Sequence, residues 1–313
     1  MKKFIVRLIL FCVPLVSLAF VADFVISKNL RKSTDRMLIG WNEIRSGKLH
    51  HDVVIMGSSR AWVQYDPQIL DSILNIDSYN LGINGSLINR QVIKYNEYCR
   101  FNVKPKVILQ NIDHMTMRIT RGYEREQFFP YFHDSSFRNA VSHYENFDIF
   151  QKHLPLLRYY GYSTLILDGL GFSKHSSVPS VKGYQGFERS WDGSAFEKIT
   201  TIYPDQDISA LRIFDEYCEK ACSEGIRMIF VYAPLYIGAT ERICDIDTMR
   251  QMYASIAEKY NIPILDYSDD PLCYNTNYFY NATHLNKTGA ELFSAKLAND
   301  IKQLGLLESV NKR

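Results

Sequence analysis

The sequence predicts a three-layer α/β/α protein built on a parallel sheet. Short apolar strands alternate with helical segments, two strands end at small-residue turns, and no internal repeat interrupts the pattern. Strands are expected at residues 52–56, 78–81, 106–109, 227–232 and 262–265. Helices are expected after Pro67 and at residues 87–101, 208–223, 248–260 and 286–304. In such a sheet, ligands bind at the carboxyl ends of the strands.

Composition narrows the class of protein. The chain has 36 basic and 34 acidic side chains, a net charge of +2, so it lacks the basic footprint of a nucleic-acid-binding domain. Its 46% hydrophobic content is typical of a packed globule and argues against disorder. The 21 tyrosines and 18 phenylalanines would suit a surface that stacks on sugars, but a large core uses the same residues.

The N-terminus predicts export or membrane anchoring. Lys2, Lys3 and Arg7 precede an apolar run, so residues 1–26 are expected to be a signal anchor or signal peptide. The small residues at 17–19 would fit cleavage, whereas the longer apolar run favours an uncleaved anchor. Basic residues flank both sides and leave the orientation nearly undetermined, but the signal-like start favours an extracytoplasmic domain, or a secreted one after cleavage.

The remainder divides into a polar, helical linker at 27–48 and an α/β domain at 49–310. Residues 115–201 are rich in Tyr, Phe, His and Ser and show no sustained period, which predicts a lid-like insertion capping the sheet edge. Apart from Cys12, the cysteines lack disulfide or metal spacing and are expected to be buried free thiols. Seven histidines show no metal-ligand spacing and are expected to be surface or packing residues: His50, His51, His114, His133, His143, His153 and His175.

Two residues are candidates for chemistry at the strand ends. Ser59 lies on a tight turn after the first strand, where backbone N–H groups could face a developing oxyanion; the alternative is a plain turn with a helix cap. Its neighbour Arg60 could contact an anionic substrate group or pair with an inner carboxylate. His284 precedes the last helix and could reach the end of the first strand, or it could cap a helix or fill the core.

Three blocks of the sequence together resemble the SGNH/GDSL hydrolase superfamily. They are Met56-Gly57-Ser58-Ser59, Asn80-Leu81-Gly82-Ile83-Asn84-Gly85 and His284-Leu285-Asn286-Lys287-Thr288-Gly289. The pattern is most similar to membrane-anchored proteins of cell-envelope acyl transfer, of the teichoic-acid D-alanylation and alginate O-acetylation type. The resemblance implies a flavodoxin-like sheet, with Ser59 as nucleophile, Ser58 at the family's aspartate position, His284 as general base and Gly85 in the oxyanion hole beside the N–H of Ser59.

Two positions depart from the family pattern. Where the family has Gly-x-Asn-Asp, this chain has Gln110-Asn111-Ile112-Asp113, so Asn111 either donates to the oxyanion from a shifted position or caps a loop with Asp113. Asn281 stands where the family has an aspartate, three residues before the histidine. Another carboxylate could then serve, a Ser–His dyad could suffice, or activity could have been lost while binding remained; the nearby acids are Asp266, Asp269 and Asp270.

The resemblance therefore predicts a serine-dependent acylesterase or O-acyltransferase that acts on an acylated cell-envelope glycan or polymer. It implies no metal or organic cofactor. For a transferase, a membrane-bound acyl donor protein would be the natural partner. The alternatives are a non-catalytic glycan-binding or assembly protein on the same fold, and a lipid esterase facing the cytoplasm.

Overall fold

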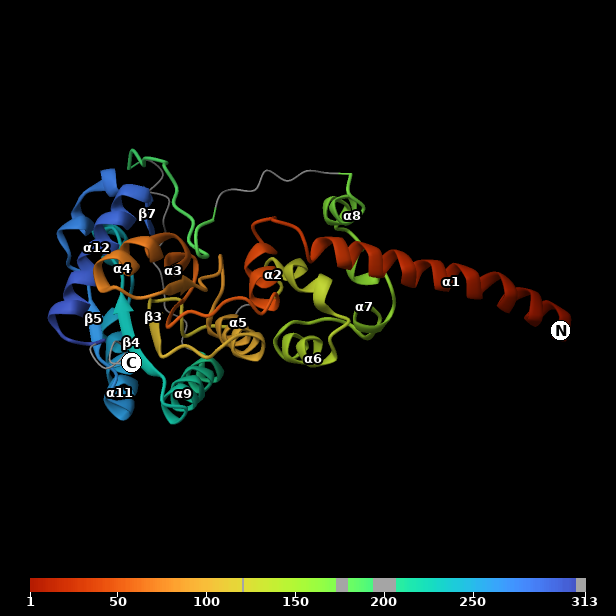
Figure 1. Cartoon of the computed structure of the whole chain (residues 1–313), viewed down its shortest axis with the longest axis horizontal. Coiled ribbons are helices and arrows are strands. Elements are labelled where there is room, and N and C mark those ends of the chain that lie inside the picture. Colours follow the sequence, from red (N-terminus) through yellow and green to blue (C-terminus); the bar gives the residue numbers. More distant parts are fainter. Residues whose placement is uncertain (120, 173–179, 194–206, 308–313) are drawn as a thin grey trace. The chain divides into compact units, whose positions relative to one another are not determined.

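The computed structural model describes residues 1–119, 121–172, 180–193 and 207–307 (Figure 1). They form two compact units: residues 1–46 with 121–178, and residues 47–120 with 179–313. Parts of the predicted insertion, including His175, lie outside the described residues. The boundary predicted at residue 26 falls inside the first helix. Of the residues predicted as a linker, 27–46 belong to the first unit and 47–48 to the second.

The second unit contains a five-stranded sheet in which every neighbouring pair is parallel. The strand order is β2-β1-β3-β4-β5, which is the flavodoxin-like order. All five strands lie where the sequence predicts them, and the predicted fold class is confirmed. Their bounds are β1 Val53–Met56, β2 Ser78–Asn80, β3 Val107–Asn111, β4 Arg227–Tyr232 and β5 Ile264–Asp266.

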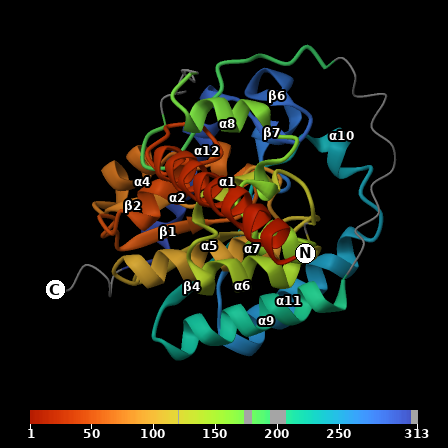
Figure 2. The same ribbon diagram turned by 90° about the vertical axis from the view of Figure 1, so that its right-hand side faces the viewer.

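Helices cover both faces of this sheet, because successive strand residues point to opposite sides. One face packs on α3 (Ser59–Gln64), α4 (Pro67–Leu74) and α12 (Lys287–Gln303) through a core that includes Ile55, Leu109 and Phe293. On the other side, α5 (Ile88–Phe101), α9 (Ile208–Ser223) and α11 (Ile246–Tyr260) lie together. Figures 1 and 2 show α9 beside α11. There, Phe230 contacts the rings of Phe214 and Tyr253.

Short elements complete the second unit near the end of the chain. The short helix α3 and a two-stranded antiparallel sheet were not predicted from the sequence. This small sheet pairs Asn281 with His284. The bounds of the remaining elements are α10 Ile237–Thr240, η4 Pro271–Tyr274, η5 Thr276–Tyr278, β6 Phe279–Asn281 and β7 His284–Leu285.

The first unit is helical and joins the N-terminus to part of the insertion. Trp41 is buried, donates a hydrogen bond to Gln127 at 2.9 Å and packs edge-on against Phe128 and Phe137. Aromatic contacts of this kind hold the short helices together in place of a periodic apolar stripe. The elements are α1 Lys2–Leu30, α2 Ile39–Arg45, η1 Arg125–Tyr131, α6 Ser135–Tyr144, α7 Ile149–His153, η2 Leu157–Tyr159 and α8 Ser163–Gly169.

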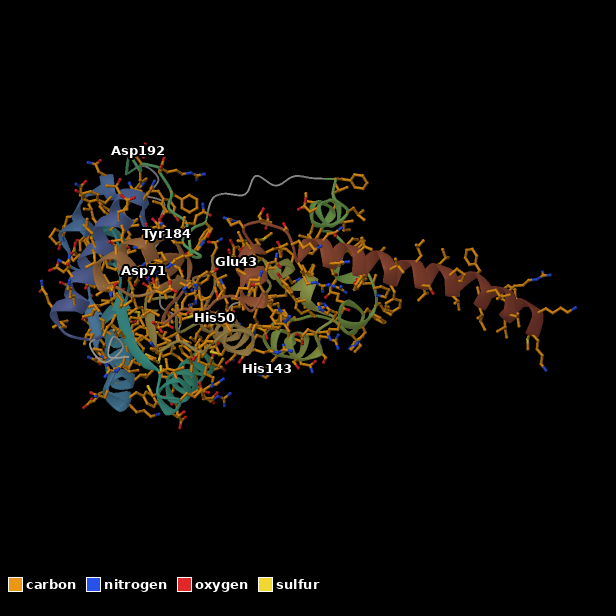
Figure 3. The ribbon with its side chains drawn as sticks, viewed as in Figure 1. Glu43, His50, Asp71, His143, Tyr184 and Asp192 are labelled. Atoms are coloured by element: carbon orange, nitrogen blue, oxygen red, sulfur yellow. The ribbon has the colours of Figure 1, made fainter. Side chains whose placement is uncertain are left out.

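Helix α1 is the apolar N-terminal helix that the sequence predicts. It has 29 residues, a mean hydropathy of 2.6 in its most apolar window, and is long and apolar enough to cross a membrane. Its apolar side chains project outward along the first two thirds of the helix (Figure 3). Near its C-terminal end, Ile26 packs against Gly169 of α8, and Asn29 donates a hydrogen bond to the Gly169 carbonyl at 2.7 Å.

All six cysteines are free thiols, as expected. Only Cys218 and Cys273 are buried. Cys99, Cys222 and Cys244 are partly exposed, so the expectation that all five were buried is wrong for these three. They lie on helix surfaces or in loops, where apolar neighbours cover them incompletely.

Candidate active site

The candidate site lies at the carboxyl ends of β1 and β3, where the sequence places its first strand-end turn. After β1, Gly57 has a φ of +153°, and a Cβ there would lie 2.7 Å from the Cβ of Ala61 and 2.9 Å from that of Asn111. Only glycine lets the chain turn this sharply against its neighbours. Ser58 then caps α3, with its Oγ accepting from the N–H of Arg60, and Ser59 is the first residue of the helix.

Ser59 and His284 are in hydrogen-bond contact although 225 positions separate them. The Oγ of Ser59 lies 2.7 Å from Nε2 of His284. This is the geometry in which a base can remove the proton of a nucleophilic hydroxyl. The ring of Tyr280 stacks on the imidazole, with centroids 5.3 Å apart and an interplanar angle of 16°. The two residues that the sequence singled out therefore meet, each fixed by a defined element.

The far nitrogen of His284 faces Asn281 and Thr283. Nδ1 lies 3.0 Å from Oδ1 of Asn281 and 2.9 Å from Oγ1 of Thr283. Oδ1 of Asn281 also accepts from the backbone N–H and the hydroxyl of Thr283, at 2.9 and 3.1 Å. An amide oxygen can only accept, so it favours the tautomer with the proton on Nδ1 and leaves Nε2 free to accept from Ser59. Thr283 was not singled out from the sequence, since a lone threonine carries no signal.

The three carboxylates considered as alternative acids make other contacts. Asp270 pairs with Lys296 at 2.7 Å and accepts from the N–H of Leu272. Asp269 accepts from the hydroxyl of Tyr274, and Asp266 accepts from the N–H of Ser268 at 2.8 Å. Among the described residues, the Asn281 amide therefore takes the place beside His284 Nδ1 that an aspartate holds in the family, and none of the three carboxylates does.

A separate buried network lies beneath the turn and is centred on Asp113. Its carboxylate accepts from the Ser58 hydroxyl and the Asn111 amide, each at 3.1 Å, and lies 3.9 Å from Nη1 of Arg60. Burial alone would raise the pKa of Asp113, but Arg60, His114 and hydrogen bonds from the Met115 N–H and the Ser58 hydroxyl hold it below its usual range. Asp113 also accepts from the N–H of Met115 at 2.8 Å, so it caps the loop as well.

Asn111 belongs to this network. Its amide nitrogen donates to Asp113, its oxygen accepts from the Tyr65 hydroxyl at 2.8 Å, and its side chain is fully buried. Both contacts tie the Asn111 amide to the interior. Gly85, by contrast, lines the cavity beside Ser59 and has a φ of +59°, a conformation that suits glycine.

Arg60 is buried, with 3% of its surface exposed. Its guanidinium donates to the carbonyl of Pro234 at 3.1 Å and to Gln64 at 3.3 Å. The sequence left two roles open for Arg60, contact with an anionic substrate group or pairing with an inner carboxylate. The structure shows the second, since Nη1 of Arg60 lies 3.9 Å from the Asp113 carboxylate. Its Nη1 has no hydrogen-bond partner among the described residues, and the residue also borders the cavity.

Electrostatics keep His284 neutral. Burial lowers the pKa of His284 to about 4, the positive charge of Arg60 adds to this effect, and Asp113 opposes it. At neutral pH the imidazole is therefore unprotonated and able to accept the Ser59 proton. His114, expected to be an ordinary packing residue, also lines the cavity, and burial lowers its pKa to about 4.

The site opens into a cavity of about 330 Å³. Ser59, His284, Thr283 and Gly85 border it, and Leu87 and Met115 supply apolar walls; the volume falls in the range of small-molecule sites. Among the described residues, no group of three His, Cys, Asp or Glu side chains could hold a metal ion.

Comparison with known proteins yields solved structures but no sequence match: no protein-family model and no curated protein matches the chain. A provisionally assigned lipolytic protein of the G-D-S-L family from Desulfitobacterium hafniense aligns over 79% of this chain and 97% of its own, with 15% identity and a TM-score of 0.38. A provisionally assigned acylhydrolase from Bacteroides fragilis aligns over 79% and 86%, with 13% identity and a TM-score of 0.37.

A third structure, described as a provisionally assigned platelet activating factor from Streptococcus pneumonia, aligns over 93% of this chain and 98% of its own, with 11% identity and a TM-score of 0.42. Similarity at this level assigns no activity to this chain, whose own strand order and site geometry are described above.

Proposed function

We propose that the chain is a serine-dependent acylesterase or O-acyltransferase of the SGNH/GDSL type. The observation that carries the proposal is the 2.7 Å contact between Ser59 Oγ and His284 Nε2 at the mouth of the cavity. The pKa of His284, about 4, leaves the base unprotonated at neutral pH, and the Asn281 oxygen supports the tautomer that a general base needs.

In the proposed reaction, Ser59 attacks the carbonyl carbon of an ester while His284 takes the hydroxyl proton. The N–H groups of Ser59 and Gly85 hold the tetrahedral oxyanion, and the protonated imidazole returns its proton to the leaving alcohol. Water or a sugar hydroxyl then attacks the acyl-enzyme, with His284 again accepting a proton. Asn111 is not assigned to the oxyanion, because its side chain is fully buried and does not line the cavity.

We assign the acylated glycan or polymer of a cell envelope as the substrate class, with a membrane-bound acyl donor protein as partner if the reaction is a transfer. The support is the combination of an apolar N-terminal helix with the three sequence blocks. In this proposal, α1 anchors the protein with both units on the extracytoplasmic side. Protease accessibility on intact cells tests the orientation, since an extracytoplasmic domain is digested while the membrane remains sealed.

Labelling and turnover test the chemistry. Full-length protein in detergent is treated with a fluorophosphonate and assayed with p-nitrophenyl acetate. We expect labelling of the wild type, loss of labelling in Ser59→Ala, and loss of turnover in both Ser59→Ala and His284→Ala. Ser255→Ala and His143→Ala, which change an exposed serine and an exposed histidine of other elements, are the controls. A wild type with neither turnover nor labelling would instead support the glycan-binding alternative, which Asn281 in the acid position favours.

A further inference from the structure

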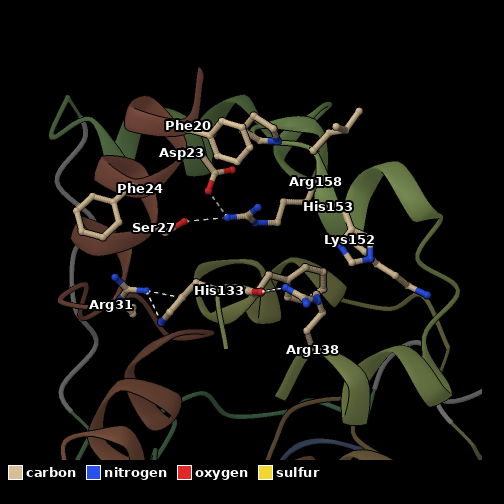
Figure 4. A pocket seen from close by; sticks show the side chains of 13 residues that line it. Phe20, Asp23, Phe24, Ser27, Arg31, His133, Arg138, Lys152, His153 and Arg158 are labelled. Atoms are coloured by element: carbon tan, nitrogen blue, oxygen red, sulfur yellow. Dashed lines mark hydrogen bonds and ion pairs between the residues drawn. The ribbon is translucent and has the colours of Figure 1, made fainter. Parts of the chain in front are cut away.

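A second cavity, of about 230 Å³, is lined entirely by residues of the first unit, whereas the proposed catalytic residues belong to the second. Figure 4 shows it between the C-terminal end of α1 and the segments around η1, α6, α7 and η2. Asp23, Ser27 and Arg31 come from the end of α1, and Arg138, Lys152 and Arg158 come from the opposing segments. The cavity therefore depends on the contact between the N-terminal helix and the insertion.

Its lining has a large excess of positive charge. Four cations, Arg31, Arg138, Lys152 and Arg158, surround it with one carboxylate, Asp23, and two histidines. Asp23 is already engaged, because it pairs with Arg158 and accepts from the N–H of Leu156 at 2.7 Å. Among the described residues, no carboxylate lies within ion-pair distance of the other three cations. A concave surface with one sign of charge and apolar walls concentrates the field on an anion.

Two of these cations are held in place by neutral partners. Arg31 donates to the carbonyl of Pro130 at 3.1 Å and contacts Nδ1 of His133 at 2.7 Å. Arg138 donates to the carbonyl of Phe132 at 2.7 Å. Burial lowers the pKa of Arg31, and the charges of Arg45 and Arg158 add to this effect. Neutral partners hold the guanidinium groups in position but do not neutralise their positive charge. A bound oxyanion would neutralise it.

The wall formed by α1 favours a lipid over a small soluble anion. Phe20 and Phe24 line the cavity with more than half of their surfaces exposed, and Val21 is similarly exposed beside them. These residues continue the outward apolar surface that runs to the N-terminus. A ligand with its charged group in the cavity could lay hydrocarbon along this surface. Arginine pairs readily with phosphate because its planar fork matches two phosphate oxygens.

We propose that this cavity binds the phosphate of a membrane-lipid headgroup, with the acyl chains lying against α1. Arg31, Arg138 and Lys152 contact the phosphate, while Arg158 is held by Asp23 and Ser27 and shapes the floor. The site would seat the first unit at the membrane surface where α1 emerges. The shared chemistry is a phosphate group, so free phosphate and a phospholipid must be distinguished by experiment.

Calorimetric titration of the full chain in a neutral maltoside detergent tests this. The probes are short-chain dihexanoyl-phosphatidic acid, dihexanoylglycerol, which lacks the phosphate, and inorganic phosphate. We expect saturable binding of phosphatidic acid, tighter than that of inorganic phosphate, and none of dihexanoylglycerol. Lys152→Gln and Arg138→Gln should each weaken binding about fivefold, the effect typical of one basic side chain at a lipid surface.

Lys28→Gln is the matched control, because Lys28 is an exposed lysine of the same unit that does not line the cavity. Equal losses in Lys28→Gln and Lys152→Gln, or equal binding of dihexanoylglycerol and phosphatidic acid, would overturn the site. Inorganic phosphate binding as tightly as phosphatidic acid would overturn the lipid as ligand. Ser59→Ala should bind phosphatidic acid normally, which separates this proposal from the ester chemistry of the other unit.

Discussion

The Asn281 side chain holds the imidazole of His284 through an oxygen that carries no formal charge. Its 3.0 Å contact with Nδ1 fixes the ring and its tautomer. An aspartate would do the same and would also stabilise the imidazolium that forms when Ser59 loses its proton. With asparagine, no such charge lies beside the ring, and the carboxylate of Asp113 only partly opposes the lowering of the His284 pKa by burial and Arg60.

Substituting Asn281→Asp should therefore accelerate ester hydrolysis. The carboxylate keeps the hydrogen bond and adds a negative charge beside the imidazolium, so we expect kcat to rise at least about tenfold. The reverse change slows a serine protease roughly 10⁴-fold, which sets the upper bound. The measurement is steady-state turnover of p-nitrophenyl acetate. Asn281→Ala, which removes the acceptor, should slow the reaction; an unchanged or reduced rate in Asn281→Asp would contradict this account.

The pH profile of kcat/KM gives a second check. Because the pKa of His284 lies near 4, the base stays unprotonated above about pH 5, and the profile should be level from there to about pH 8. Activity should fall as the pH drops through about 4, where protonation removes the acceptor of the Ser59 proton. An unperturbed histidine would give this acid limb near about 6.5. In Asn281→Asp the limb should move upward, since a carboxylate favours the imidazolium.

At the residue scale, the sequence predicted the contact between Ser59 and His284, the proposed reacting pair, but not the hydrogen bonds that hold the residues around them. Ser59 and His284 could be predicted because each follows a strand or precedes a helix whose position is visible in the apolar pattern. The hydrogen bonds of Asn111, by contrast, depend on Asp113 and Tyr65. Which way a side-chain amide turns is decided by such tertiary neighbours, and no sequence spacing encodes it.

At the scale of elements, α3 is positioned by the segment that follows β2, whose Gly82 lies against the backbone of α3. A Cβ at Gly82 would lie 2.3 Å from the backbone nitrogen of Trp62 and 2.6 Å from its Cα. Asn80 strengthens the contact, because its amide donates to the carbonyls of Ala61 and Tyr65 at 2.7 and 2.9 Å. The first turn of α3, which carries Ser59, is thus fixed from β2.

Substituting Gly82→Ala should push α3 away and misplace Ser59. We expect a loss of about 1–3 kcal/mol in unfolding free energy, as for overpacking in a core. Turnover should fall by one to two orders of magnitude, since displacements near about 1 Å can cost about 100-fold. Urea unfolding and p-nitrophenyl acetate turnover measure the two effects.

Gly225→Ala is the control for this substitution. Gly225 has a φ of +76°, and a Cβ there would meet nothing within 4 Å, so alanine strains the backbone without a clash. This variant should lose stability but retain full turnover. Equal loss of turnover in both variants would show that stability alone, and not the placement of α3, limits the reaction.

The elements of the second unit were predictable because burial on both faces makes its strands continuous apolar runs. The six-residue α3 was missed, since a helix of fewer than two turns is too short for its apolar period to be detected. The helices of the first unit that lie in the insertion could not be placed from the sequence for a different reason. Its short helices are joined by aromatic pairs such as Phe129 with Tyr159 and Tyr162, and such contacts leave no repeating pattern in the sequence.

At the scale of the whole molecule, the proposed catalytic residues and the apolar helix belong to different units. Ser59 and His284 lie in residues 47–120 and 179–313, while α1 belongs to the unit formed by residues 1–46 and 121–178. Membrane attachment and ester chemistry should therefore be separable.

A variant lacking residues 2–19 tests this separation. These residues project outward from α1, so their removal takes little from the packing of the first unit. We expect the full chain in the membrane pellet after salt and carbonate washing, and the truncated chain in the soluble fraction with unchanged kcat/KM. Truncated protein that stays in the pellet, or that is soluble but inactive, would contradict the separation.

The discontinuous chain of the first unit constrains the order of events during synthesis. Residues 1–46 leave the ribosome long before residues 121–178, which supply their packing partners, including Phe128 for Trp41 and Arg158 for Asp23. Residues 1–46 therefore cannot complete the packing of the first unit until β1, β2 and β3 have been translated. An N-terminal helix already inserted in a bilayer would shelter its apolar surface from aggregation during that interval.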